Sequence, residues 1–226
     1  MLWARRRRGW RVPMGSTTIS CRILVFAKAP VPGQVKTRLA PTLGKCGAAQ
    51  LHRKLVERTL DTASTAALGA IELCCAPDAS HAYFAACAKR HGLSLHTQGE
   101  GDLGVRMARA LERPLALGAP ALLIGCDCPV LTPAYLHEAA TALACGADAV
   151  FGPAEDGGYV LIGLARAPRA QLFEAISWGT DTVMQDTRAR LRQLGWCWRE
   201  LAPLWDVDRP EDLLRLRQLR DGFVHD

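Results

Sequence analysis

The chain has 226 residues, of which 49% are hydrophobic and 22% are charged. This composition is typical of a globular protein and excludes a disordered chain, a collagen-like fibre and a coiled-coil rod. The sequence has no run of about 18 apolar residues, so no membrane span is expected. The formal net charge is +6, but five arginines in the first 13 residues, at positions 5–8 and 11, account for most of it. The remainder is nearly neutral (6 − 5 = +1), which argues against a nucleic-acid partner.

Residues 1–20 are predicted to form a disordered basic extension. A secretion signal needs an apolar run of about 7–15 residues after its basic region. Here the arginines lead into GWRVP at 9–13, which is not such a run. Charge runs of this kind are usually solvated tails, and a functional basic arm is the alternative.

Nine cysteines are scattered along the chain, and no two of them have C-x-x-C spacing. Several lie in apolar runs, where a thiol behaves as a small hydrophobic group. Together with the missing secretion signal, this pattern predicts a cytoplasmic location, where thiols stay reduced. A zinc site on Cys126 and Cys128 is the alternative, but it would need two further ligands that no nearby spacing supplies.

Short apolar runs alternate with helical patterns throughout the sequence. Strands are predicted at 22–27, 70–75, 93–96, 121–124, 147–151, 159–164 and 197–201. Helices are predicted at 50–66, 80–91, 103–117 with a bend near Pro114, from 132, at 169–175, at 182–194 and from 210. This alternation predicts an α/β fold, with one domain over 21–226 and a mainly parallel sheet covered by helices on both faces.

In such sheets ligands bind beyond the carboxyl ends of the strands, and the first strand runs into a basic loop. That loop carries three cations and a hydroxyl: Lys28, Lys36, Thr37 and Arg38. Cations this close repel one another unless an anion neutralises them, and phosphate suits both Arg and Lys. The loop is not a P-loop, because G-x-x-x-x-G-K-[ST] is absent. A solvated basic loop is the alternative.

Carboxylates in two further segments indicate a binding site for a divalent metal. Asp127 comes directly after the predicted strand at 121–124, where it could hold a metal beside phosphate oxygens or simply form a turn. Asp206 and Asp208 alternate in an extended segment, so both could face one metal. Residues 210–212 read as the first turn of a helix, where acidic side chains suit the helix dipole.

The segment at 152–159 offers a candidate general base. Glu155 and Asp156 stand before the pair Gly157 and Gly158. Either acid could deprotonate an acceptor, and the glycines allow the backbone to approach a ligand closely. A plain hairpin turn is the alternative.

The glycine pattern at 99–104, GEGDLG, matches the G-x-G-x-x-G of dinucleotide-binding proteins. Such a fingerprint should follow a strong strand, whereas the preceding one at 93–96 is weak. An NAD-type oxidoreductase would also leave the basic loop and the carboxylates without a role. This function is therefore the weaker interpretation.

In their order, six stretches resemble a known bacterial family. They are FAKAPVPGQVKTRLAP (26–41), QGEGDLGVRM (98–107), IGCDCPVLTP (124–133), GPAEDGGYVLIGL (152–164), SWGTDTV (177–183) and DVDRPEDL (206–213). The sequence resembles GT-A glycosyltransferases of the arsenosugar-biosynthesis-type branch, which is related to the molybdenum-cofactor and phospholactate nucleotidyltransferases. The resemblance implies a nucleotide-diphospho-sugar-transferase-like fold with the nucleotide over the amino-terminal strands.

The resemblance also implies roles for residues of this chain. It implies that Lys28, Lys36 and Arg38 bind phosphates and that Asp127 and Asp208 bind a metal. It also implies that Asp156, Gly157 and Gly158 face the sugar or acceptor, and that Trp178 and Thr180 lie on the acceptor side. Three departures stand out. Asp127-Cys128-Pro129 has one acid where many members have D-x-D, Cys126 replaces a usual serine, and Arg209 replaces a capping threonine, which weakens that cap by about 1 kcal/mol.

Together these features predict a metal-dependent glycosyltransferase that uses Mg²⁺ or Mn²⁺. Its partners would be a nucleotide-diphospho-sugar donor and a small-molecule acceptor. A nucleotidyltransferase that joins an NTP to a phosphorylated small molecule, releasing pyrophosphate, is the alternative, since it needs the same phosphate and metal ligands. A catalytically inactive nucleotide-binding regulator is a third, which the retained Asp127, Asp208 and cations argue against.

Overall fold

The computed structural model describes residues 20–219, which form one seven-stranded sheet with the order β3-β2-β1-β4-β6-β5-β7. The strands are β1 (Arg22–Lys28), β2 (Ile71–Ala76), β3 (Ser94–Thr97), β4 (Ala121–Gly125), β5 (Ala149–Pro153), β6 (Tyr159–Leu164) and β7 (Trp198–Glu200). The basic extension predicted at 1–20 lies outside the described residues except for its last position.

Most strand pairs are parallel, and β6 is the exception. The pairs β1–β2, β1–β4, β2–β3 and β5–β7 are parallel, whereas β6 pairs antiparallel with both β4 and β5. The connection between β5 and β6 is too short for a crossover, and a short connection can join only antiparallel strands. The segment at 152–159 is therefore a hairpin, and it carries Asp156.

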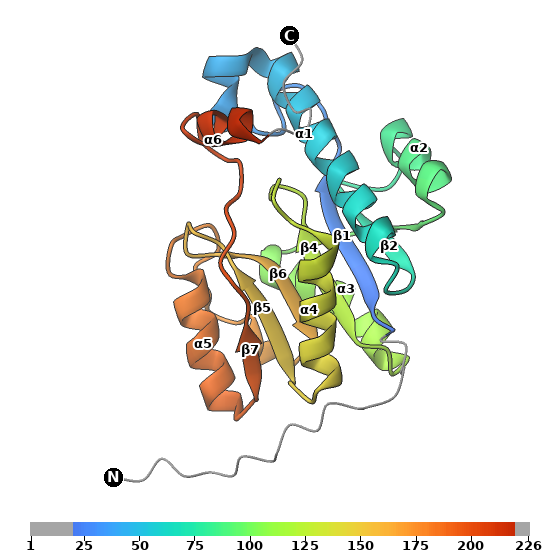
Figure 1. Cartoon of the computed structure of the whole chain (residues 1–226), viewed down its shortest axis with the longest axis vertical. Coiled ribbons are helices and arrows are strands. Elements are labelled where there is room, and N and C mark those ends of the chain that lie inside the picture. The colour runs from blue at the N-terminus through green and yellow to red at the C-terminus, as the bar shows by residue number, and fades with distance from the viewer. Residues whose placement is uncertain (1–19, 220–226) are drawn as a thin grey trace.

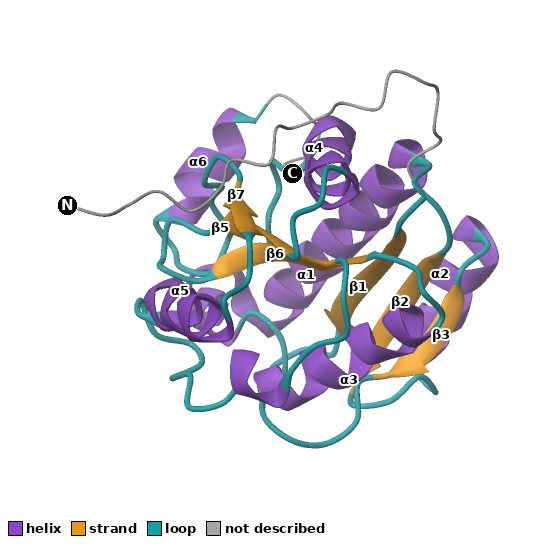
Figure 2. Ribbon diagram, turned by 90° about the horizontal axis from the view of Figure 1, so that it is seen from below, coloured by secondary structure: helices purple, strands orange, loops and turns teal. Residues whose placement is uncertain are grey.

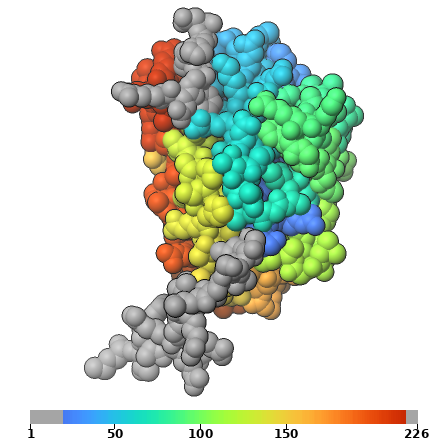
Figure 3. Space-filling model, turned by 45° about the vertical axis from the view of Figure 1, so that its right-hand side comes forward, coloured from blue at the N-terminus to red at the C-terminus, as the bar shows by residue number. Residues whose placement is uncertain are grey.

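Helices cover both faces of the sheet (Figures 1 and 2), which confirms the predicted fold class. They are α1 (Ala40–Ala66), α2 (Ala82–His91), α3 (Leu103–Ala116), α4 (Pro133–Ala144), α5 (Val183–Leu194) and α6 (Asp212–Gln218). Side chains of β1 alternate between two cores: Ile23 packs with α1, α2 and α4, and Leu24 packs with α3 and α5. Figure 3 shows α4 (yellow), α1 (blue to cyan) and α2 (green) next to one another, on the face of the sheet where Ile23 packs.

The last segment returns to the beginning of α1. A third core joins Leu39, Leu51 and Leu55 to Trp205 and Val207, together with apolar residues of α6. Figure 1 shows α6 beside the amino-terminal half of α1. This packing brings residues 206–208 next to the basic loop, which precedes them by about 170 positions.

Three helical predictions differ from the structure. The helix predicted from 50 begins at Ala40 and includes a non-helical Gly44 (φ 71°), because apolar contacts to α6 order the earlier turns. The helix predicted at 169–175 is only the 3₁₀ turn Ala170–Leu172, since few of its side chains can be buried. The last helix begins at Asp212 rather than at residue 210.

Within residues 20–219, no helix combines the length and hydropathy that a membrane span requires. All nine cysteines are free thiols. The cytoplasmic location stays a prediction.

Gly163 on β6 is a packing constraint that can be tested. A Cβ at this position would lie 2.5 Å from both Leu122 Cδ2 and Val150 Cγ1, which are completely buried. We expect Gly163→Ala to lower the free energy of unfolding by about 1–3 kcal/mol through overpacking, measured by denaturant unfolding. Gly125→Ala is the matched control, because nothing lies within 4 Å of its new Cβ. Equal stability changes in the two variants would contradict the argument.

Candidate functional site

Two adjoining cavities lie at the carboxyl ends of the parallel strands, and Asp127 lines both. The larger, of about 520 Å³, lies against the basic loop. The smaller, of about 200 Å³, lies against the β5–β6 hairpin and the segment at 178–183. Leu103 and Gly125 are also common to both linings. The site sits where ligands bind in open α/β sheets.

Lys36 is the most constrained cation of the basic loop. Its side chain is 4% exposed, and its ammonium lies 2.7 Å from Asp127 Oδ1 and 2.5 Å from the Val207 carbonyl oxygen. Burial by itself lowers the pKa of Lys36, but the charge of Asp127 and its hydrogen bond outweigh burial and raise the pKa. The ammonium thus stays charged and links the loop after β1, the end of β4 and the carboxyl-terminal segment.

The other loop residues also line the larger cavity. They are Lys28, Thr37 and Arg38. Arg38 forms an ion pair with Asp208, and its guanidinium is 64% exposed. The predicted phosphate ligands therefore come together on one wall, although Lys36 and Arg38 already have carboxylate partners.

Arg106 is a fourth cation of this cavity that sequence reasoning missed. It lies on α3, and its guanidinium donates to Oε1 of the buried Gln98 at 2.9 Å. Gln98 in turn donates to the Cys74 carbonyl at 2.8 Å. The available signal was Arg106's position in the first turn of the helix that follows the glycine segment at 99–104.

The glycines of that segment have structural roles in this fold. A Cβ at Gly99 would lie 2.4 Å from Arg109 Nη1, and one at Gly104 would lie 2.6 Å from the Trp178 ring. Asp102 caps α3 by accepting a hydrogen bond from the Val105 N–H at 2.9 Å. The glycines of this pattern thus allow the start of α3 to pack against neighbouring side chains.

The smaller cavity is acidic and aromatic. Three carboxylates line it, those of Asp127, Asp156 and Asp206, and Tyr159 and Trp178 lie there with ring centroids 6.4 Å apart. Gly158 and Thr180 line it as well. Its described lining contains no lysine, arginine or histidine. A ligand in this cavity would therefore meet negative charge and aromatic rings.

Asp206 has an unusual pKa in this cavity. Burial, followed by the negative charges of Asp156 and Asp127, raises its pKa from 3.8 to about 6, against the opposing effect of Lys36. Carboxylates that repel one another in this way favour a cation between them.

The β5–β6 hairpin separates the two candidate bases. Asp156 lines the smaller cavity and accepts a hydrogen bond from the Gly158 N–H at 2.9 Å. Glu155 instead forms a two-point ion pair with Arg215 of α6, at 2.7 and 3.2 Å, and lines neither cavity. The Arg215 guanidinium lowers the pKa of Glu155. Of the two acids, only Asp156 lines one of the two cavities.

Gly157 holds the hairpin in place beside this cavity. Its φ is +91°, and a Cβ there would lie 2.1 Å from the Asp181 carbonyl oxygen. Its own carbonyl accepts from the Met184 N–H at 2.9 Å. Gly157 therefore allows the hairpin to approach the Asp181 backbone closely, whereas the sequence predicted a close approach to a ligand.

Asp206 and Asp208 do not face the same space. Asp206 lines the smaller cavity and Asp208 the larger one. Simple alternation fails because residues 205–208 lie outside any strand, and the backbone turns so that Asp212 accepts from the N–H groups of Asp208 and Arg209. Asp127 is the carboxylate that both spaces share.

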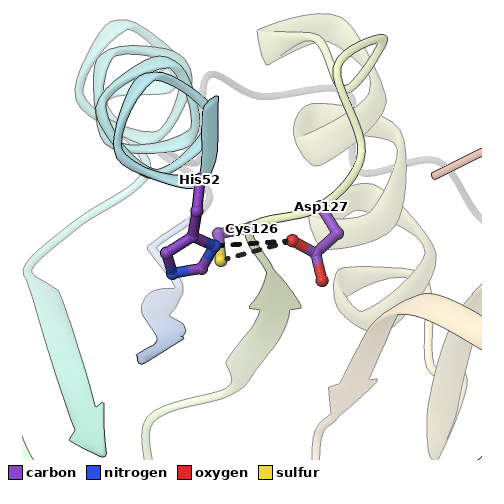
Figure 4. Close-up of side chains that lie close together, drawn as sticks. All are labelled: His52, Cys126 and Asp127. Atoms are coloured by element: carbon purple, nitrogen blue, oxygen red, sulfur yellow. Dashed lines mark hydrogen bonds and ion pairs between the residues drawn. The ribbon is translucent and has the colours of Figure 1, made fainter. Parts of the chain in front are cut away.

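A histidine that the sequence did not single out lies beside Asp127. His52 of α1, Cys126 and Asp127 bring their ligand atoms within 4.8 Å of one another (Figure 4). Burial lowers the pKa of His52 and raises that of the Cys126 thiol far above its usual value. Cys128, the predicted zinc partner of Cys126, is not in this group. His52 was missed because only the packing of α1 on the sheet brings it to β4.

The family model described as "Uncharacterized protein conserved in bacteria (DUF2064)" matches residues 59–180. This range includes Asp127 and Asp156, but neither the basic loop nor Asp206 and Asp208. The chain matches no curated protein.

Solved structures resemble most of the chain. A protein of Desulfovibrio desulfuricans G20, provisionally described as a nucleotide-diphospho-sugar transferase, is 30% identical with a TM-score of 0.78; the match covers 90% of this chain and 89% of that one. The fold is also similar to that of a 4-diphosphocytidyl-2C-methyl-D-erythritol synthase of Anaerococcus prevotii DSM 20548 (11% identity, TM-score 0.58, 87% and 96% covered). A nucleotidyl transferase of Methanothermobacter thermautotroptrophicus is 16% identical, with a TM-score of 0.58 and 90% and 97% covered.

The raised pKa of Asp206 predicts a pH-dependent gain in stability for Asp206→Asn. The folded chain holds this proton up to about pH 6, whereas an unfolded aspartate loses it near pH 4. The free energy of unfolding therefore falls as the pH rises from about 4 to 6 and stays lower above it. We expect Asp206→Asn to be more stable at pH 7.5 by on the order of 2 kcal/mol, with a much smaller gain at pH 4.

Denaturant unfolding at both pH values, with a chelator present to remove metal ions, measures this effect. Glu112→Gln is the control, because that carboxyl group is exposed on α3 and lines neither cavity. A gain for Asp206→Asn that is equal at the two pH values would rule out the pKa explanation.

Proposed function

The chain belongs to the DUF2064 family, and from this membership and the site we propose that it is a metal-dependent glycosyltransferase. It would transfer a sugar from a nucleotide-diphospho-sugar to a small-molecule acceptor. The resemblance to the arsenosugar-biosynthesis-type branch supports this reaction, and so does the description of the D. desulfuricans relative. The division of the site into a cationic and an acidic cavity supports it independently.

In this proposal the larger cavity binds the donor. Its wall carries Lys28, Lys36, Arg38 and Arg106, which together can neutralise a diphosphate. Arg38 and Arg106 can each bind two phosphate oxygens, whereas a lysine acts as a point charge. As the nucleoside diphosphate leaves, negative charge grows on its oxygens, and the cations stabilise that charge.

Asp127 and Asp206 would be the first ligands of the proposed Mg²⁺ or Mn²⁺. Asp127 and Asp206 line the same cavity and offer the oxygen ligands that these ions prefer. Asp208, which lines the larger cavity, would be available to the ion only if Arg38 exchanged it for a phosphate. When bound, the metal would neutralise charge on the departing diphosphate.

Asp156 is the proposed general base. The proton of the acceptor hydroxyl passes to the Asp156 carboxylate while the acceptor oxygen forms its bond to the anomeric carbon. The bond from that carbon to the phosphate oxygen breaks, and the nucleoside diphosphate leaves with the electron pair. The Gly158 N–H donates to Asp156 Oδ1 and thereby orients the carboxylate.

The choice between the two reactions rests on the lining of the smaller cavity, whose described residues include no cation. A nucleotidyltransferase of the predicted kind would bring a phosphorylated acceptor against Asp127, Asp156 and Asp206, and like charges placed together cost free energy. A neutral sugar and hydroxyl avoid this repulsion, and Trp178 and Tyr159 offer faces for a sugar ring. Nucleotidyl transfer remains the alternative, supported by the shared fold of the nucleotidyl transferases.

Ligand-induced stabilisation tests the donor. We expect one nucleotide-diphospho-sugar, with Mn²⁺, to raise the melting temperature, since a ligand at 100 times its Kd adds about 2.7 kcal/mol. The panel contains nucleotide-sugars and free NTPs, each with and without Mn²⁺. Asp127→Asn should lose the metal-dependent part of the shift. A shift from an NTP alone, with pyrophosphate as the later product, would replace glycosyl transfer by the alternative.

Substitutions of the adjacent acids Asp156 and Glu155 form a matched pair that tests the assignment of the general base. Asp156→Asn keeps the size and the hydrogen bond to Gly158 but cannot accept the proton, so kcat should fall by about 10²–10⁴-fold with little change in donor affinity. Glu155→Gln removes an acid that faces Arg215, so kcat should stay within about threefold. Steady-state kinetics with the donor found above gives both values. Comparable losses in the two variants would exclude the assignment.

A further inference from the structure

His52, Cys126 and Asp127 place three different ligand atoms around one point. His52 comes from α1, while Cys126 and Asp127 follow β4. Figure 4 shows the His52 ring and the Cys126 sulfur both directed at the Asp127 carboxylate. The distances to Asp127 Oδ1 are 3.9 Å from His52 Nδ1 and 3.9 Å from Cys126 Sγ.

The proton arrangement of His52 leaves a lone pair facing this point. His52 Nε2 lies 3.0 Å from the Lys28 carbonyl oxygen, which can only accept, so Nε2 carries the hydrogen. In the neutral ring Nδ1 is then an acceptor. Its side chain is 5% exposed, and Nδ1 has no hydrogen-bond partner within the described part of the chain.

The Lys36 ammonium lies 2.7 Å from Asp127 Oδ1 and neutralises that carboxylate, but it leaves the buried Nδ1 of His52 without a partner, which is unfavourable. The set of one nitrogen, one sulfur and one oxygen atom selects the kind of cation. Magnesium and manganese prefer oxygen ligands, whereas imidazole and thiolate together suit zinc and its transition-metal neighbours. All three residues line the larger cavity, which gives an ion a route of entry.

We propose that His52, Cys126 and Asp127 form a binding site for one transition-metal ion of the zinc type, with a fourth position open to the larger cavity. On binding, Cys126 releases its thiol proton to solvent and ligates as the thiolate. The ion takes the place of the Lys36 ammonium at Asp127 Oδ1, and that ammonium keeps the Val207 carbonyl. This site does not depend on the proposed glycosyl transfer, but occupation by zinc would take Asp127 from Mg²⁺ or Mn²⁺.

Cobalt absorption on the full chain tests the site, because Co²⁺ reports a thiolate ligand by charge-transfer absorption and its coordination by visible bands. We expect one Co²⁺ per chain after chelator treatment, with a thiolate band that added Zn²⁺ abolishes. Cys126→Ser should remove the band, and His52→Ala should weaken Co²⁺ binding by at least about tenfold. Cys128→Ser is the matched control, a buried cysteine two positions away, and it should retain the band.

Lys36→Met distinguishes Co²⁺ binding at this site from adventitious Co²⁺ binding elsewhere on the chain. Removing the competing ammonium should tighten Co²⁺ binding, whereas binding to exposed Cys46 or Cys197 would not change. Near-ultraviolet circular dichroism shows that each variant keeps its fold. A thiolate band that persists in Cys126→Ser, wild-type affinity in His52→Ala, or no Co²⁺ binding to the folded wild-type chain would overturn the proposal.

Discussion

The buried ammonium of Lys36 is the interaction on which the site depends. A charged amine that is 4% exposed needs partners, since an unpaired charge in the interior is very costly. Its partners are Asp127 at the end of β4 and the Val207 carbonyl. Three segments that are distant in sequence therefore meet at one atom, and both cavities form around this junction.

The second constraint is the separation of charge around Asp127. In the lining of the larger cavity the four cations of the basic loop and α3 outnumber two carboxylates, Asp127 and Asp208, while the smaller cavity is lined by three carboxylates and two aromatic rings. A ligand with an anionic end and a neutral end would fit across the boundary, with its bond to be broken near Asp127. A nucleotide-diphospho-sugar has this distribution of charge, so the electrostatics support the proposed function independently of any resemblance.

The same carboxylate belongs to both of the proposed metal sites. Toward the smaller cavity Asp127 stands with Asp206, an all-oxygen set. Toward α1 it stands with His52 and Cys126, a nitrogen and sulfur set. Lys36 holds Asp127 between these two surroundings, so any metal at the site must compete with a cation that the chain itself supplies.

The sequence by itself determined the strands, most of the helices and the segments that form the site, because burial alternation, turn residues and local charge are local properties. It predicted Asp127, Asp156 and the basic loop at the sheet edge, since carboxyl ends of parallel strands share that edge. Only the tertiary structure decided that Glu155 turns to Arg215, that Asp206 and Asp208 face different cavities, and that His52 and Arg106 join the site. These outcomes depend on how α1 and α3 pack on the sheet and how α6 packs against α1. Contacts between segments 60 or more positions apart leave no periodic signal in the chain.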